Sequence, residues 1–102
     1  MSPNLKSRVF SEHLHTSFYI QLEGSGPLTL KLVEVTVGKP SPGFEQFSLF
    51  FLGPHAPQLG QGTHKVKHDK MGSFDLFLVP VGVDRDGMLY EAAFAVLVRT
   101  EP

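Results

Sequence analysis

Two histidines in the middle of the chain, His64 and His68, have the spacing most suggestive of chemistry, because imidazole is a common ligand of zinc. Four residues apart, they would share one face of a helix. The residues between them, Lys65, Val66 and Lys67, instead favour a strand, on which the two rings would lie about 13 Å apart. That distance is too long for one ion. We therefore predict no metal site and place both rings at the rim of a barrel, one of them bonded to a backbone carbonyl.

The Asp-Arg-Asp-Gly sequence at 84–87 resembles the start of a calcium-binding loop, in which alternating carboxylates and a glycine wrap a hard cation. The rest of such a loop is absent, because Ala95 occupies the position of the bidentate glutamate. Turn chemistry accounts for the same residues, since aspartate favours the entry to a turn and glycine its left-handed exit. We predict a turn and not a cation site.

Catalytic residues are not predicted at any position. The chain has no cysteine, and none of its serines has the sequence context of a nucleophile elbow. Asp75 and Glu91 would lie on neighbouring strands as solvent-facing acids, an arrangement common in sheets without catalysis. The prediction is that the protein is not an enzyme and has no cofactor.

Charge gives no reason to expect a nucleic-acid or membrane partner. The chain has 9 basic and 10 acidic residues and a formal net charge of −1. Lys65, Lys67 and Lys70 are interpreted as the solvated face of a short strand, because no exposed aromatic residues alternate with them. The amino-terminal residues lack the apolar run of a signal peptide, and no segment is long enough to span a bilayer, so we expect cytoplasmic synthesis.

The elements that would position these residues are almost all strands. Residues 1–9 are predicted to be a flexible lead-in, and residues 10–102 a single β domain. Ser11–Leu14 is predicted to form one helical turn, capped by Ser11 and plugging one end of the sheet. Alternating apolar residues then predict strands within 17–23, 28–37, 44–52, 63–68, 74–83 and 88–97.

These strands predict an all-β fold: a roughly six-stranded antiparallel meander that forms a small barrel or a tightly coiled sandwich. In the second strand the apolar parity slips after Leu32, because Val33, Val35 and Val37 are apolar and Glu34 is not. A β-bulge near Leu32 and Val33 would restore an apolar inner face and bend the strand. Barrel and sandwich both remain open at this point.

The last two strands are predicted to form a hairpin around Gly87. A three-residue loop closed by this glycine would be a type I turn with a G1 bulge. The predicted pairs are Val83 with Gly87, Pro80 with Tyr90, Leu78 with Ala92, Leu76 with Phe94, and Phe74 with Val96. This register puts Asp75 and Glu91 together on the outward face of the hairpin.

That outward face is too apolar to be left in water, and it is the candidate interface. Its predicted residues are Phe50, Leu52, Phe77, Val79, Val81, Leu89, Ala93, Ala95 and Leu97. Contiguous apolar patches of this kind usually mark a contact. Either another protein subunit, including a second copy, covers the face, or the chain's own amino-terminal segment and loops fold over it.

Several blocks of the chain resemble a family of small bacterial all-β domains of unknown function. The blocks are the Phe-Ser-Leu-Phe-Phe-Leu-Gly-Pro run at 47–54, Gln-Gly-Thr at 61–63, Leu-Phe-Leu-Val-Pro-Val-Gly at 76–82, Asp84, Gly87, Tyr-Glu-Ala at 90–92, and Phe94. The likeness extends from about Phe10 to Phe94 and departs from the family pattern at His64, where a tyrosine is usual. Some members are encoded near phage-tail-collar-like proteins, which implies a structural or assembly role and assigns no catalytic residue.

The sequence therefore predicts a non-catalytic structural or protein-interaction module, as a subunit of a phage-tail-like or other oligomeric assembly. Its partner would be itself or another subunit, bound through the apolar sheet face. The alternative from a different class is a small-ligand-binding barrel or an enzyme accessory domain with His64 and His68 at its mouth. A roomy interior would favour that alternative, whereas an interior filled by large side chains would favour the interaction module.

Overall fold

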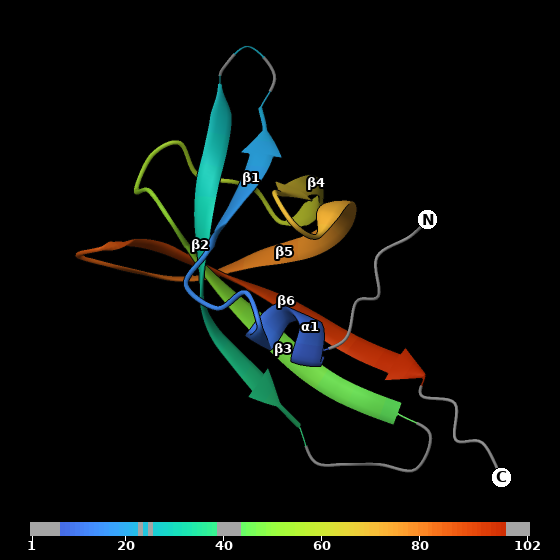
Figure 1. Ribbon diagram of the computed structural model, residues 1–102. Coiled ribbons are helices and arrows are strands. Elements are labelled where there is room, and N and C mark those ends of the chain that lie inside the picture. The colour runs from blue at the N-terminus through green and yellow to red at the C-terminus, as the bar shows by residue number, and fades with distance from the viewer. Residues whose placement is uncertain (1–6, 23, 25, 39–43, 98–102) are drawn as a thin grey trace, which may run out of the picture.

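The computed structural model is a mostly β protein in which the strands form one sheet that closes on itself (Figure 1). The structure describes residues 7–22, 24, 26–38 and 44–97. Within them lie one short helix and six strands: α1 (Ser7–Ser11), β1 (Ser17–Gln21), β2 (Pro27–Val37), β3 (Phe44–Gly53), β4 (Gly62–His68), β5 (Gly72–Asp84) and β6 (Gly87–Leu97). The predicted all-β class, with its small antiparallel barrel and short amino-terminal helix, is confirmed.

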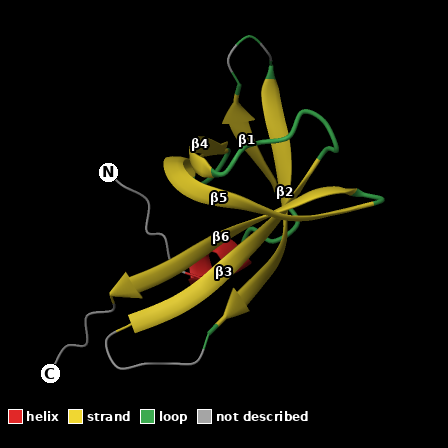
Figure 2. Ribbon diagram, turned by 180° about the vertical axis from the view of Figure 1, so that it is seen from behind, coloured by secondary structure: helices red, strands yellow, loops and turns green. Residues whose placement is uncertain are grey.

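The order of strands around the ring is β1-β2-β3-β6-β5-β4, and every neighbouring pair is antiparallel. Two three-stranded meanders, β1–β3 and β4–β6, are thus joined by one crossing connection between β3 and β4. The ring closes between β1 and β4 through only two residue pairs, Tyr19 with Lys67 and Ile20 with Val66. Figure 2 shows the same ring from behind, with the β5–β6 hairpin projecting from it.

Alternation along the strands builds the core, because every second side chain points inward. The inward positions of β1, β2, β3 and β5 carry large apolar side chains, whereas their neighbours in sequence are mostly exposed or half-buried. The largest fully buried side chains are Tyr90, Phe10, Phe18, Phe51, Ile20, Leu30, Leu32, Leu49, Leu76, Leu78 and Val66. The interior of the barrel is therefore occupied by side chains.

The bulge predicted in β2 is confirmed. The register between β2 and β3 shifts between Leu32 and Glu34, so that Val33 is the extra residue. Leu32 is fully buried on one side of the shift, and Val35 packs against the core on the other. The bulge therefore keeps the inward face apolar through the bend, as the parity slip indicated.

The predicted register of the β5–β6 hairpin is correct in its middle and wrong at both ends. Pro80 pairs with Tyr90 as expected, but Asp84, and not Val83, lies opposite Gly87. The reason is that the Asp84 carboxylate accepts hydrogen bonds from the backbone N–H groups of Asp86 and Gly87, at 2.7 and 3.1 Å, which closes a tighter loop. A bulge at Val81 absorbs the extra residue and restores the predicted pairing.

Beyond Val79 the two strands separate, so the remaining predicted pairs do not form. Residues 72–78 of β5 pair with β4, and the carboxyl-terminal half of β6 pairs with β3. The sequence-based register assumed a two-stranded ribbon of full length. A closed ring with tilted strands instead shares each long strand between two neighbours.

Helix α1 packs against β2 and β3, and its Phe10 ring reaches aromatic rings of β5 and β6. It begins at Ser7, inside the predicted lead-in, and ends at Ser11, where the helical turn was predicted to begin. The start of the helix is held by a residue far away in the sequence, because the backbone N–H and hydroxyl of Ser7 both donate to the carboxylate of Glu45. Phe10 is fully buried, whereas Leu14, at the end of the predicted turn, is 36% exposed. The predicted role of plugging one end of the barrel thus belongs to Phe10.

The connection between β3 and β4 is tied to the core at one point. The backbone N–H of Leu59 donates to the hydroxyl of Tyr90 at 2.8 Å, and both side chains are buried. This bond satisfies the polar end of a fully buried tyrosine.

Candidate functional site

The candidate site is the outward surface of β3, β6 and residues 77–84 of β5, which we call the outer face. The strand pairings place Phe50 opposite Glu91 and Glu91 opposite Val79, so these three residues form a row across three strands. Leu52 and Leu89 are opposite each other in a second row. Facing side chains on neighbouring strands lie about 4.5–5.5 Å apart, so the rows form one continuous surface.

The structure exposes most of the predicted interface. Phe77 is 51% exposed and Val81 47%, which is unusual for large apolar side chains. Phe50, Leu52, Val79 and Leu89 are half-buried, and Ala93 and Ala95 are exposed. The side chain of Leu97 lies outside the described part of the chain. No segment among the described residues covers Phe77 or Val81. Helix α1 does not reach them, because it lies on the opposite, inward side of the sheet.

The two acids predicted to share the outward face are in fact apart. Asp75 lies opposite Lys65 of β4, because this part of β5 does not pair with β6. Glu91 lies among the apolar residues of the outer face, where its carboxylate accepts a hydrogen bond from the hydroxyl of Ser48 at 2.7 Å. The two carboxylates are therefore not arranged as an acid–base pair.

The structure adds Glu34 to the outer face. The β2 bulge brings it opposite Phe50, so the aromatic ring lies between two glutamates on its neighbouring strands, Glu34 and Glu91. Sequence reasoning placed Glu34 only as a break in parity. The useful indication was the bulge itself, because it decides to which face the residues after Leu32 turn.

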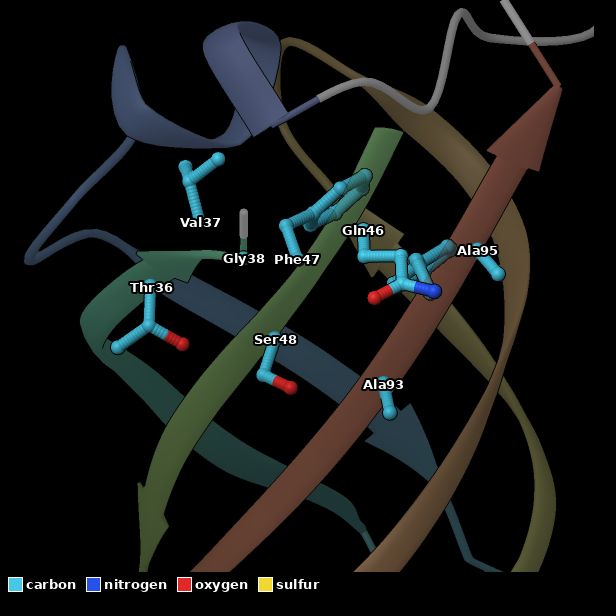
Figure 3. Close-up of a pocket in the computed structure, with 9 residues that line it drawn as sticks. Thr36, Val37, Gly38, Gln46, Phe47, Ser48, Ala93 and Ala95 are labelled. Atoms are coloured by element: carbon cyan, nitrogen blue, oxygen red, sulfur yellow. The ribbon is translucent and has the colours of Figure 1, made fainter. Parts of the chain in front are cut away.

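At the far end of the outer face lies a shallow hollow (Figure 3). Thr36, Ser48 and Ala93 lie side by side on three neighbouring strands, and Figure 3 shows how little space their side chains fill. The residues that line the hollow are Thr36, Val37, Gly38, Gln46, Phe47, Ser48, Ala93, Phe94 and Ala95. None of these side chains is ionisable, so the described lining of the hollow offers no acid, base or strong metal ligand.

His64 and His68 have separate environments. The Nε2 atom of His64 is 2.9 Å from the carbonyl oxygen of Gly60, as predicted for one of the two rings. His68 is only 5% exposed and is the one buried polar residue of the described core, which its predicted place at the rim did not anticipate. The described residues contain no group of three histidine, aspartate or glutamate side chains suited to hold a metal ion.

His68 connects the β4–β5 turn to the segment that follows α1. Its Nδ1 atom accepts hydrogen bonds from the backbone N–H groups of Lys70 and Met71, at 3.0 and 3.1 Å. A neutral ring then carries its proton on Nε2, which donates to the hydroxyl of Thr16 at 3.0 Å. The Thr16 hydroxyl in turn donates to the carbonyl of His13 at 2.5 Å. Such a chain of bonds requires the neutral form of His68.

Burial lowers the pKa of His68 from its ordinary value of 6.5. The charges of His13 and, to a lesser degree, Lys70 act in the same direction, while Asp69 opposes them. The ring centroid of His13 lies 4.6 Å from that of His68, and the ring centroid of Phe18 lies 4.5 Å from it, both in tilted arrangements. A positive charge on His13 therefore disfavours a second positive charge on His68.

Acidification is therefore expected to destabilise the fold through His68. Between pH 6.5 and the lowered pKa of the folded chain, the unfolded chain binds more protons at this histidine than the folded chain does, so the free energy of unfolding falls as the pH decreases through this range. A His68→Asn variant keeps an acceptor near the turn and cannot titrate. We expect it to be less stable at neutral pH but to show a flatter pH profile in urea unfolding. Identical slopes for both proteins would refute this role of His68.

The Asp-Arg-Asp-Gly sequence forms the turn of the β5–β6 hairpin, as predicted. Asp84 is occupied by the two backbone bonds that close the loop, and its carbonyl lies 2.6 Å from Nε2 of His55. Asp84, Arg85 and Asp86 are all exposed. The residues that resembled a calcium loop thus have a structural use.

No helix in the described ranges is long and apolar enough to cross a membrane.

Comparisons with known proteins place the chain in a family. No curated protein and no solved structure matches the chain. The model of one family, described as Domain of unknown function (DUF6916), matches residues 5–94. The chain, with the closed six-stranded sheet and apolar outer face described above, belongs to this family of domains of unknown function.

Proposed function

We propose that the protein is a non-catalytic structural or interaction module that binds another protein subunit through its outer face. The observation that carries this proposal is the exposure of Phe77 and Val81 next to the rows of Phe50, Val79 and Leu89. Isolated apolar residues on a surface need no explanation, but a contiguous group spread over three strands does. Aromatic residues in such a group are the usual anchors of protein interfaces.

The filled interior supports this function over a small-ligand-binding barrel. Phe10, Phe18, Phe51 and Tyr90 are fully buried inside a ring of only six strands. Small barrels of this size have room for their own side chains and little else. An enzyme accessory role through His64 and His68 is also disfavoured, because both ring nitrogens of His68 and the Nε2 atom of His64 are already bonded within the domain.

The finer part of the proposal is that the protein is a subunit of a phage-tail-like or other oligomeric assembly. Its support is the resemblance of the sequence to small bacterial domains encoded near phage-tail-collar-like proteins. A compact domain with a packed core and one uncovered apolar face is suited to such a role, because assembly buries the face that the monomer leaves in water.

Replacing Phe77 and Val79 with serine is expected to weaken partner binding by about tenfold or more, because anchor residues at an interface each contribute upwards of 1 kcal/mol. The measurement is affinity purification of the tagged protein from its native cells, followed by titration of the recovered partner. Val83→Ser is the matched control, because Val83 is on the same strand and 62% exposed but lies at the projecting hairpin tip. Equal recovery with all three proteins would contradict the proposal.

A further inference from the structure

The junction between β1 and β4, which we call the seam, has the fewest residue pairs of any junction in the described sheet. Only Tyr19 with Lys67 and Ile20 with Val66 are paired there, whereas β3 and β6 share ten pairs. The two meanders, β1–β3 and β4–β6, meet only at the seam and at the β3–β6 junction. Opening the seam would therefore leave the meanders joined by the longer junction.

The side chain of His68 bridges the seam at the point where its backbone pairing ends. This histidine follows Lys67 in β4, and its Nε2 atom lies 3.0 Å from the hydroxyl of Thr16, the residue before β1. Its Nδ1 atom accepts hydrogen bonds from the backbone N–H groups of Lys70 and Met71. One ring thus ties the β4–β5 turn to the start of β1.

Protonation of His68 is incompatible with this bridge. A protonated Nδ1 atom is a donor, and it would face two backbone N–H groups that are donors as well. The ring is only 5% exposed, so water does not replace the lost bonds while the ring stays in place. A charged ring must therefore leave its position, and its bond to Thr16 is lost with it.

The groups around His68 do not remove this conflict. The titratable side chains that line the hollow beside the ring come from the segment after α1, from β1 and from the β4–β5 turn: Glu12, His13, Tyr19, Asp69 and Lys70. Burial lowers the pKa of His68 most, His13 and Lys70 lower it further, and Asp69 opposes them. The closed seam therefore favours the neutral ring.

We propose that the domain contains a pH switch: neutral His68 keeps the seam closed, and protonation of His68 opens the seam while the β3–β6 junction stays paired. Segments with few pairs open at a lower free energy than the rest of a fold, which makes the seam the place where the lost bonds take effect. Opening admits water to Ile20 and Val66, which are buried in the closed sheet. The switch goes beyond the proposed function, because the seam is not part of the outer face.

Amide hydrogen exchange measures the opening, after correction for the pH dependence of exchange in unstructured peptides. We expect the amides of β1 and of residues 66–68 to exchange at a lower opening free energy than those between β3 and β6. Protection at the seam should fall about threefold or more between about pH 7.5 and about pH 5.0. The fall cannot exceed about tenfold per pH unit, because opening is linked to the uptake of one proton.

Histidine variants identify the group that titrates. His68→Asn removes the titration, so we expect a seam that opens more readily at neutral pH and has lost its pH response. His13→Asn should reduce the response, because it removes a charge that opposes protonation of His68 in the closed state. His64→Asn is the matched control on the same strand, since its ring is bonded to the carbonyl of Gly60 and not across the seam, and it should respond like the wild type.

A disulfide across the seam tests the location of the opening and does not depend on the folding of His68→Asn. The chain has no cysteine, and Tyr19 lies opposite Lys67, so Tyr19→Cys with Lys67→Cys places one pair of thiols there. The oxidised form should lose the acid response at the seam, and the reduced form should keep it.

Three results would overturn the switch. They are equal opening free energies at the seam and at the β3–β6 junction in acid, a pH response that survives in His68→Asn, and an oxidised disulfide variant that responds like its reduced form. None of them affects the proposed function, which is tested separately by partner loss in the Phe77→Ser, Val79→Ser variant.

Discussion

Replacing Phe10 with alanine is expected to lower the free energy of unfolding by about 3–5 kcal/mol, the usual cost of deleting a buried aromatic side chain. The ring is fully buried, and its centroid lies 5.8–6.4 Å from those of four other aromatic rings, Phe18, Phe47, Phe74 and Phe94. These rings come from β1, β3, β5 and β6, so one side chain links both meanders. Domains of this size are stable by only about 5–15 kcal/mol, so the loss is a large fraction of the total.

Urea unfolding measures this effect, and Leu14→Ala is the matched control. Leu14 is also apolar and belongs to the same amino-terminal segment, but it is 36% exposed, so its truncation is expected to cost less than about 0.5–1 kcal/mol. Phe10→Leu keeps most of the apolar volume and should cost less than about 1.5 kcal/mol. A Phe10→Ala variant that unfolds at the same urea concentration as Leu14→Ala would show that α1 is a dispensable cover.

Local alternation was sufficient to predict the strands and one of the two bulges. The parity slip after Leu32 predicts the β2 bulge correctly, because an inward face must stay apolar whichever way the strand bends. Pro80 lies opposite Tyr90 as predicted from the turn at Gly87, but only because the second bulge, at Val81, offsets the error at the tip of the hairpin. These features depend on side chains that lie next to each other in sequence or within a single hairpin.

Features that depend on distant contacts were not predictable in this way. The backbone N–H of Ser7, where α1 starts, donates to Glu45, a residue 38 positions away, and local sequence does not reveal such a partner. The burial of His68 follows from the β1–β4 closure and from Thr16, 52 positions away. Separation of β5 from β6 likewise follows from closing the ring, which alternation within one strand cannot specify.

The candidate site was predictable in its residues but not in its extent. Apolar residues on both faces of β3 and β5 predicted the outer face, because a monomeric barrel buries only one side of each strand. Its charged border was missed, since Glu34 joins it only through the register across the bulge. Lys65 and Lys67 were predicted to lie on the solvated face of a short strand, and both are exposed. Their place beside Tyr19 was not predictable, because the pairing of Tyr19 with Lys67 joins two separate meanders.

Adding a single methyl group at Gly87 is expected to have the second-largest effect on the free energy of unfolding. Its φ angle is +149°, a conformation that side chains rarely adopt, and a Cβ atom placed there would lie 2.0 Å from the carbonyl oxygen of Gly53. That oxygen belongs to the backbone of β3, which pairs with β6 through Gly53 and Met88. A side chain at Gly87 therefore forces the ends of both strands apart.

We expect Gly87→Ala to lower the free energy of unfolding by about 2–5 kcal/mol, because unfavourable backbone geometry and overpacking each cost about 1–3 kcal/mol. Gly82→Ala is the matched control within the same hairpin. A Cβ atom at Gly82 meets no atom within 4 Å, so this variant should change stability by less than about 1 kcal/mol. Urea unfolding of the two variants side by side decides the matter: equal stability would mean that the hairpin tip can move away from β3 freely, and that the close approach of Gly87 to Gly53 is not needed for closure of the sheet.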